Sequence, residues 1–561
     1  MKTRAKPIVH TLADLMVEVE AGLGLSPGRQ QDIASDLRAL ARLTGQPLEI
    51  LPADNRRLRP LLAKVHPVQA GVSKKRLQNI RSSLATALRI TRFAPGVALS
   101  TTPMAPAWRA LYERLPDRQT KYGLSGFIRF CSAHEVAPDA VTDQVAADYH
   151  QHLVDHALRA HPNVVYQRTC RVWNAAREQI PDWPDVTLAI PSFRRPVITV
   201  PLNQFPESFV EELDRYLHWL AGDDLLADHQ PPQRCKPRTV AGRRDHLHRL
   251  ASAAIHGGVS LATVDSLATL VSREVVEVCL QYYIDRFEGH PTTYVRDLAK
   301  TLKLVAQHWV CADDKHVAWL RRLVHRLDTA PPGLTEKNRA MLRQFDSVPN
   351  LQRLLAVPDT LMARASTIAD PNRAAHLYVW GLVIELLIYA PMRIGKLATL
   401  RVDRHLVRPE GPKGPVIIAL AADETKHGRP HEYPLPNATG RKLDRYLREH
   451  RPALLTEPQS PWLWPDRRGN HKSTITMSEA VAKHIYRETG LKVTPHQFRH
   501  LAAKLILAAR PGEYELARQV LGHQHVSMTV NFYAGVQSRD SVALYDEIVI
   551  QQRKSSKGTS R

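Results

Sequence analysis

The deciding stretch of this chain reads Thr494-Pro495-His496-Gln497-Phe498-Arg499-His500, then Leu521-Gly522-His523, then Asn531-Phe532-Tyr533-Ala534-Gly535. Pro495 is typical of the first turn of a helix and Thr494 of its N-cap, so His496 and Arg499 are expected on one helical face. A guanidinium can bind two phosphate oxygens, and an imidazole can donate a hydrogen bond or move a proton. A nearby phenol can attack phosphorus. The stretch therefore predicts a site for a phosphate group.

Two segments upstream complete a pattern. They read Ala390-Pro391-Met392-Arg393-Ile394-Gly395-Lys396-Leu397 and Glu424-Thr425-Lys426-His427-Gly428-Arg429. Taken in order, the four elements resemble the tyrosine recombinases, also called the phage integrase family. Members carry an arginine box, a lysine-bearing β-hairpin turn, His-x-x-Arg, Leu-Gly-His and a nucleophilic tyrosine. One departure is Lys396, which stands where the family usually has an acidic residue that supports the first arginine.

The resemblance implies a role for each site residue. Arg393 and Arg499 would clamp the scissile phosphate, Lys426 would protonate the departing 5′ oxygen, His496 would be the acid/base partner, His523 would hydrogen-bond the phosphate, and Tyr533 would attack to give a 3′-phosphotyrosine. Two arginines supply the charge that stabilises a pentacoordinate phosphorus, so neither a metal nor a cofactor is expected. The covalent link retains the energy of the phosphodiester, so religation needs no ATP.

The implied function is site-specific DNA recombination in the integration or excision of a mobile element. A type IB topoisomerase shares the chemistry, and a non-catalytic DNA-binding relative would share the fold. Because all six catalytic-type positions are filled, loss of activity is disfavoured, and Leu-Gly-His with tandem helical units favours a recombinase. His496 and His500 form H-x-x-x-H, but Gln497 occupies the position where a zinc protease needs glutamate.

Composition supports a polyanionic partner. The 561 residues carry a formal net charge of +22 and a pI of about 9.9, which favours double-stranded DNA. The five cysteines are scattered and form no C-x-x-C, so neither disulfides nor a zinc ribbon is expected, and a reducing cytoplasm with nucleoid association is the expected compartment. The apolar run from Gly381 to Ala390 is too short to span a bilayer, so no membrane partner is expected.

Apolar residues at helical spacing predict a mainly α protein with a small β-hairpin or sheet in its catalytic domain. The expected order is helical unit 1 at 1–95, core-binding-like unit 2 at 96–200, unit 3 at 201–327, a linker at 328–349, the catalytic domain at 350–552 and a basic tail at 553–561. Unit 3 matches the family's core-binding domain, a SAM-like helical fold, in position. Two strands, Val416 to Ala421 and His431 to Leu435, are expected around a turn at Gly428.

The resemblance also implies assembly. A homo-tetramer would synapse two DNA sites, and a C-terminal segment with Val542, Leu544, Tyr545, Ile548 and Val549 would dock on the neighbouring protomer. Units 1 and 2 would touch either DNA or proteins. Their basic residues are Lys74, Lys75, Arg76 and Arg81 in the first unit, and Arg168 and Arg171 in the second. The target sequence and any accessory recombinases are left open.

Overall fold

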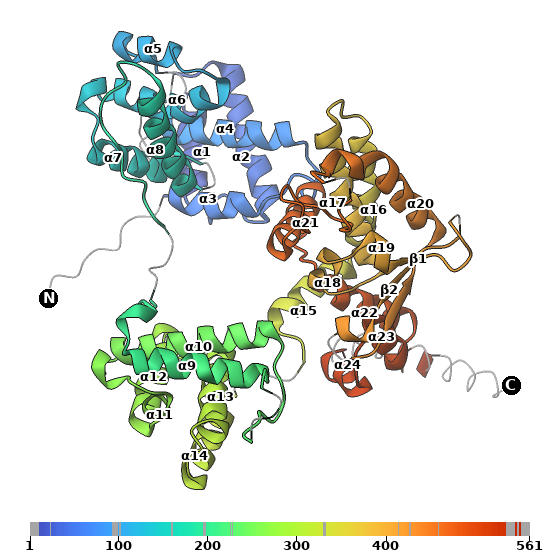
Figure 1. Cartoon of the computed structure of the whole chain (residues 1–561). Coiled ribbons are helices and arrows are strands. Elements are labelled where there is room, and N and C mark those ends of the chain that lie inside the picture. The colour runs from blue at the N-terminus through green and yellow to red at the C-terminus, as the bar shows by residue number, and fades with distance from the viewer. Residues whose placement is uncertain are drawn as a thin grey trace. The chain divides into compact units, whose positions relative to one another are not determined.

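The computed structural model describes residues 10–22, 24–91, 99, 102–158, 161–193, 198–224, 226, 228–328, 333–412, 414–425, 428–457, 459–533, 545–546 and 549–550 (Figure 1). Most of these residues are helical, and three short strands form a small antiparallel sheet, which confirms the expected fold class. The chain divides into two units, one made of residues 1–193 with 334–561 and the other of residues 194–333.

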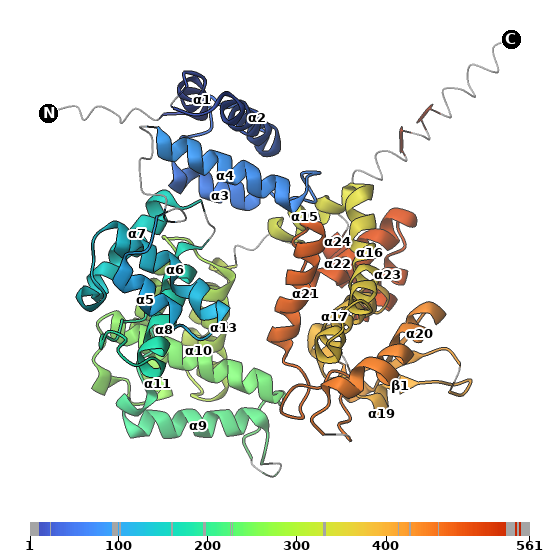
Figure 2. The same cartoon turned by 90° about the horizontal axis from the view of Figure 1, so that it is seen from above.

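The first helices pack around their own apolar cluster. They are α1 (Leu12–Glu20), α2 (Pro27–Thr44), α3 (Asn55–Lys64) and α4 (Lys74–Ile90) (Figure 2). Ile33, Leu37 and Leu40 of α2 are buried at helical spacing. Gly45 ends that helix in the left-handed conformation, with a φ of 67°, which glycine adopts without steric cost.

The next four helices are α5 (Pro106–Glu113), α6 (Arg118–Ala133), α7 (Asp143–His156) and α8 (Pro162–Gln179). Their core is aromatic, with Trp108, Phe127 and Trp173 buried in mutual contact. Arg59 of α3 donates hydrogen bonds to the carbonyls of Val154 and Ala157 at the C-terminus of α7. A cation there satisfies carbonyls that the helix leaves unpaired and complements the negative end of the helix dipole.

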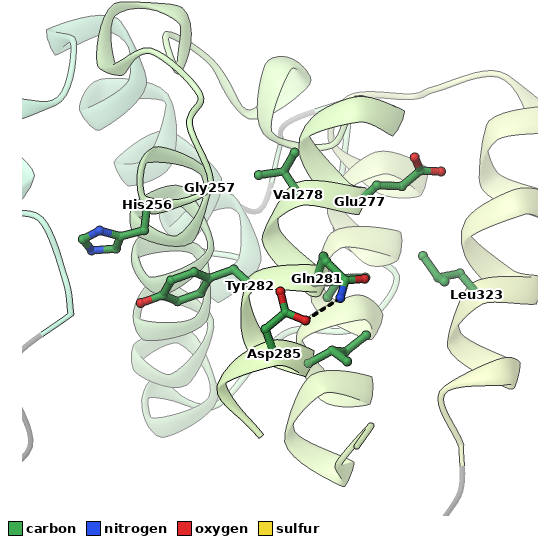
Figure 3. A pocket seen from close by; sticks show the side chains of 10 residues that line it. His256, Gly257, Glu277, Val278, Gln281, Tyr282, Asp285 and Leu323 are labelled. Carbon is green, nitrogen blue, oxygen red and sulfur yellow. Dashed lines mark hydrogen bonds between the residues drawn. The ribbon is translucent and has the colours of Figure 1, made fainter. Parts of the chain in front are cut away.

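The separate unit at 194–333 consists of α9 (Glu207–Ala221), α10 (Pro237–His256), α11 (Leu267–Leu270), α12 (Arg273–Arg286), α13 (Thr293–His308) and α14 (Asp314–Arg326). Its core is made by apolar positions from all six helices. A groove of about 620 Å³ lies among α10, α12 and α14 (Figure 3). Glu277 and Asp285 line it, and these carboxylates disfavour a phosphate ligand there.

The C-terminal helices enclose the largest apolar cluster. They include α15 (Glu336–Arg343), α16 (Val348–Ala365), α17 (Pro371–Tyr389), α20 (Asn437–Arg445) and α21 (Thr474–Thr489). Helices α16 and α17 pack side by side (Figures 1 and 2). Helix α17 is buried on nearly all faces because Leu382, Val383 and Leu386 and their neighbours are apolar around its circumference.

The sheet has the order β1-β2-β3, with β1 (Leu406–Val407), β2 (Ile417–Leu420) and β3 (His431–Pro434). All pairs are antiparallel, and Ile418 faces Leu406 on one side and Tyr433 on the other. Strands β2 and β3 lie within the two expected strand segments. The sequence pattern missed β1, because two residues are too few to show alternation.

The prediction of a linker at 328–349 is wrong for the residues from 334 onward. Leu334, Met341, Leu342 and Phe345 are buried in the C-terminal cluster, and Lys504 donates a hydrogen bond to the carbonyl of Leu342. Helix α15 therefore already belongs to the C-terminal domain, which begins about a helix earlier than expected.

Two further findings concern the described residues. All five cysteines, Cys131, Cys170, Cys235, Cys279 and Cys311, are free thiols. No helix in the described parts of the chain is long and apolar enough to cross a membrane. The docking segment expected around Val542 to Val549 and the basic tail at 553–561 fall largely or wholly outside the described residues.

Candidate active site

The first arginine is placed by the end of a buried helix. Helix α17 ends at Tyr389, just ahead of Pro391, because the residue before a proline is disfavoured in the helical conformation. Arg393 then caps the short helix α18 (Ile394–Ala398) and is half-buried. Its guanidinium forms no ion pair with any described carboxylate, and the same holds for Lys396. The cation of Arg393 is therefore not neutralised by the described part of the protein.

The His-x-x-Arg helix begins later than expected. Helix α22 spans Gln497–Ala509, and His496 is its N-cap. Thr494 does not cap the helix; its backbone N–H donates instead to the side-chain oxygen of Gln497 at 2.8 Å. Pro495 lies in the turn before the helix. As a result the side chain of His496 is exposed, whereas Arg499 and His500 are buried.

Arg499 connects three of the sequence motifs. Its Nη1 donates to the carbonyl oxygen of Pro391 at 2.8 Å, and its Nη2 donates to that of Leu521 at 2.5 Å. The side chain thus bonds to the residue ahead of Met392-Arg393 and to the first residue of Leu-Gly-His. Arg499 is only 5 % exposed, so these two bonds are made out of contact with bulk water.

His523 is oriented by the helix that follows it. Gly522 ends helix α23 (Tyr514–Leu521) with a φ of 59°, a left-handed conformation that reverses the chain. The Nδ1 atom of His523 lies 3.0 Å from the hydroxyl of Thr529, which is fully buried in helix α24 (Val526–Tyr533). Because Nδ1 is engaged by Thr529, this contact fixes the orientation of the imidazole ring.

Tyr533 ends α24 and lies inside the domain. The side chain is 2 % exposed and packs in the C-terminal cluster. Its hydroxyl lies 2.6 Å from Nδ1 of His500, which is 7 % exposed. The rings of the two residues are T-shaped, with centroids 5.8 Å apart. The phenol and the imidazole therefore form a buried hydrogen-bonded pair.

The electrostatics of the site favour an anion. Burial and the nearby charge of Arg393 lower the pKa of Arg499, since no described carboxylate compensates either guanidinium. Desolvation of the His496 ring by neighbouring protein atoms lowers its pKa, and the positive charges of Arg499 and Arg393 lower it further. Burial, together with His496, Arg499 and His523, lowers the pKa of His500 to about 4. Burial raises the pKa of Tyr533, and Arg499 offsets part of that rise.

Strand β3 also contributes residues that lie against Arg499. The hydroxyl of Tyr433 interacts with the guanidinium, and Arg499 and Arg393 partly offset the rise that burial causes in the pKa of Tyr433. The ring of His431 lies beside Gly522 and stacks edge-on against Tyr433, with centroids 4.4 Å apart. Lys426, in the turn between β2 and β3, lies outside the described residues, so its position relative to these groups is not described.

The structure thus brings Arg393, His496, Arg499, His523 and Tyr533 into one region of the C-terminal domain. The arrangement has two uncompensated guanidinium groups, three imidazoles and a phenol. No group of three or more potential metal ligands occurs among the residues that the structure describes. The chemistry that these groups can perform is the binding of a phosphate diester and attack on it by an oxygen nucleophile.

The sequence of the C-terminal domain also matches a known protein family. Residues 350–539 match the Phage integrase family. The C-terminal domain belongs to the phage integrase family.

Two curated proteins match part of this chain. Tyrosine recombinase XerA of Pyrococcus horikoshii is 25% identical over 155 residues, which cover 26% of this chain and 47% of that protein. XerA of Pyrococcus furiosus matches with the same identity and coverage. The chain thus spans about half the length of the curated relatives it matches.

Solved structures that match this chain include a lambda integrase dimer bound to a COC′ core site. It is 15% identical, covers 65% of this chain and 85% of that chain, and has a TM-score of 0.35. The XerH site-specific recombinase bound to a difH substrate, a pre-cleavage complex, is 12% identical, with 59% and 94% coverage and a TM-score of 0.30.

Three contacts in the integrase-family domain could not be assigned from the sequence. His500 is half of H-x-x-x-H and follows Arg499 directly, as is usual in the family that the motifs resemble, but neither pattern links it to a tyrosine 33 residues later. Thr529 and Tyr433 carry no motif. The alternation that places Tyr433 on the buried face of a strand was the only available signal for its role.

Proposed function

We propose that this protein is a site-specific DNA recombinase that cleaves and rejoins strands through a 3′-phosphotyrosine. Arg393 and Arg499 hold the scissile phosphate, His523 donates a hydrogen bond to it, and Tyr533 attacks the phosphorus. Lys426 protonates the departing 5′ oxygen. His496, exposed at the start of α22, contacts the scissile phosphate of the DNA as an acid/base partner. The support for His523 is its ring orientation, fixed by Thr529.

One observation carries the proposal. Arg499, which has no described carboxylate partner, lies near Arg393 and near a tyrosine hydroxyl that is already hydrogen-bonded to an imidazole. A buried arginine without a carboxylate is costly, and the cost is offset when an anion with bidentate geometry binds. The phosphate diester of DNA supplies the charge, and the net charge of +22 favours its approach.

The test is covalent trapping. Incubation of the full chain with DNA that is nicked next to the cleavage position should leave a protein–DNA adduct, because the short downstream fragment diffuses away. Tyr533→Phe should bind DNA as the natural chain does and form no adduct. Tyr514→Phe, at the start of α23, is the matched control and should form the adduct at an undiminished yield. An adduct of normal yield with Tyr533→Phe would refute the assignment of the nucleophile.

The trapping assay and an assay of supercoiled-plasmid relaxation together separate the alternatives. A type IB topoisomerase would relax supercoiled DNA without paired sites, and a non-catalytic DNA-binding relative would form no adduct with any DNA. We favour the recombinase because three helical clusters precede the catalytic domain, as expected for a protein that surrounds a long DNA site. On this proposal the enzyme synapses two sites as a homo-tetramer, with the unit at 194–333 as the core-binding domain, and serves a mobile element in integration or excision.

A further inference from the structure

The hydrogen bond between Tyr533 and His500 has a direction. Burial lowers the pKa of His500 to about 4, so its imidazole is neutral near pH 7, and burial raises that of Tyr533, so its phenol is protonated. In the tautomer of this neutral ring that carries its proton on Nε2, the phenol O–H donates and Nδ1 of His500 accepts, at 2.6 Å, and this is the tautomer that general-base catalysis requires. The nucleophile of the proposed reaction already points its proton at a base.

We propose that His500 is the general base that takes the proton of Tyr533 during DNA cleavage. This inference rests on the proposed function. As the Oη–P bond forms, the bond between Oη and its proton breaks and the proton passes to Nδ1 of His500. The bond between phosphorus and the 5′ oxygen breaks at the same time, and that oxygen leaves with a proton from Lys426. Religation runs in reverse, so protonated His500 returns the proton to the departing phenol.

The other candidate base is His496, the imidazole to which the sequence analysis gave the acid/base role. It caps α22 and is exposed, and its ring lies against that of His500 with centroids 5.1 Å apart. Tyr533 is buried and its hydroxyl lies within hydrogen-bonding distance of His500. Proton transfer requires such contact, so geometry assigns the base to His500 and leaves His496 to the phosphate.

Several groups bear on the protonation of His500. His496 and Arg499 lie on its own helix, His523 lies in the segment before α24, and Tyr533 comes from α24. The imidazoles and the guanidinium all disfavour a positive charge on His500. A bound DNA phosphate opposes them, because its negative charge stabilises an imidazolium. The base therefore becomes stronger when substrate is present, which suits proton transfer in the complex rather than in the free protein.

The decisive variant is His500→Asn in the full chain. The side-chain oxygen of asparagine lies close to the position of Nδ1, so it keeps an acceptor for the phenol but cannot take up a proton. Loss of a general base typically lowers a rate by about 10²- to 10⁴-fold. We expect a loss of that size in the single-turnover rate of adduct formation on nicked DNA, with DNA affinity and thermal unfolding unchanged. His376→Asn on α17, away from the site, is the matched control and should cleave as the natural chain does.

A substrate with a sulfur leaving group distinguishes loss of the general base from loss of the general acid. In DNA with a 5′-bridging phosphorothiolate at the cleavage position, the departing thiolate needs no proton. This substrate should restore cleavage by Lys426→Ala and should leave His500→Asn slow. Replacing Tyr533 by 3,5-difluorotyrosine, whose phenol has a lower pKa, should instead raise the rate of His500→Asn and lessen its defect.

Each outcome has a fixed meaning. Cleavage by His500→Asn within about threefold of the natural rate overturns the assignment, and so does its rescue by the phosphorothiolate, which would place His500 on the leaving group. Absence of any adduct with the natural chain would instead reject the proposed recombinase function.

Should His500→Asn fail to fold, ¹⁵N-histidine spectra of the full chain provide an independent measurement. The Nδ1 resonance of His500 should move in Tyr533→Phe, whereas an unmoved resonance would show that the hydrogen bond is absent and overturn the proposal.

Discussion

Replacing Arg499 by lysine tests whether one side chain both binds phosphate and holds the motifs together. Lysine keeps the positive charge but presents one compact donor group. The two carbonyls that Arg499 contacts, those of Pro391 and Leu521, are bonded by two separate nitrogens of its planar fork, and lysine has a single nitrogen in place of that pair. Arg499→Lys therefore leaves at least one buried carbonyl without its donor.

The size of the effect follows from these contacts. A hydrogen bond that involves a charged group contributes about 1.5–3 kcal/mol, so the free energy of unfolding should fall by about that amount. For a domain of roughly 200 residues this lowers Tm by about 3–12 °C. The guanidinium fork is also lost from the phosphate, which should reduce the cleavage rate by about 10²- to 10³-fold.

The assay pairs differential scanning calorimetry of the full chain with single-turnover cleavage of nicked DNA. Arg445→Lys is the matched control, because Arg445 is exposed and forms an i,i+4 ion pair with Glu449. Exposed pairs contribute about 0–1 kcal/mol, so this variant should unfold and cleave nearly as the natural chain does. An Arg499→Lys protein as stable as the Arg445→Lys protein would show that the carbonyl bonds do not hold the motifs in place.

Three further predictions address the site and its surroundings. Thr529→Val should lower cleavage about tenfold to a hundredfold by releasing the ring of His523, whereas Thr529→Ser should retain activity; equal rates in the two variants would contradict the orienting role. Cleavage should persist in EDTA, because Arg393 and Arg499 supply the charge that a metal would bring, and a complete loss that magnesium or zinc restores would point to a metal-dependent nuclease. Lys74 and Lys75 are exposed on α4, whereas Arg76 pairs with Asp36 and Arg81 bonds to the carbonyl of Leu62. If helical unit 1 touches DNA, replacing both lysines by alanine should flatten the dependence of log affinity on log salt by about two units. An unchanged slope would assign that unit to protein contacts.

Helices with long apolar stripes were predictable from the sequence. Ile33, Leu37 and Leu40 in α2 and Leu298, Leu302 and Val305 in α13 recur at helical spacing, and both helices form where the spacing places them. The integrase-family domain was predictable from the order of four short motifs, each too weak alone. Local pattern suffices in these cases because neighbouring residues in the chain specify the helix and the motif.

The contacts that organise the site were not predictable in this way. The bonds of Arg499 join residues 108 and 22 positions apart, and the pair of His500 and Tyr533 spans 33 positions. Such contacts depend on how the whole domain packs. The start of α22 and the fold of residues 334–345 were missed for a related reason: a short helix is stabilised by the surface it packs against, which its own sequence does not reveal.

The double engagement of Arg499 has an evolutionary consequence. If the proposed function holds, a descendant of this chain that no longer cleaved DNA would lose Tyr533 more easily than Arg499. Phenylalanine preserves the packing of a buried ring, whereas any substitute for the guanidinium leaves two buried carbonyls without their donor. Inactive homologues that keep the fold should therefore retain the arginine long after its chemical task has ended. In such a lineage, an intact His-x-x-Arg would indicate common descent only. The presence or absence of a tyrosine at the position of Tyr533 would indicate whether the homologue is active.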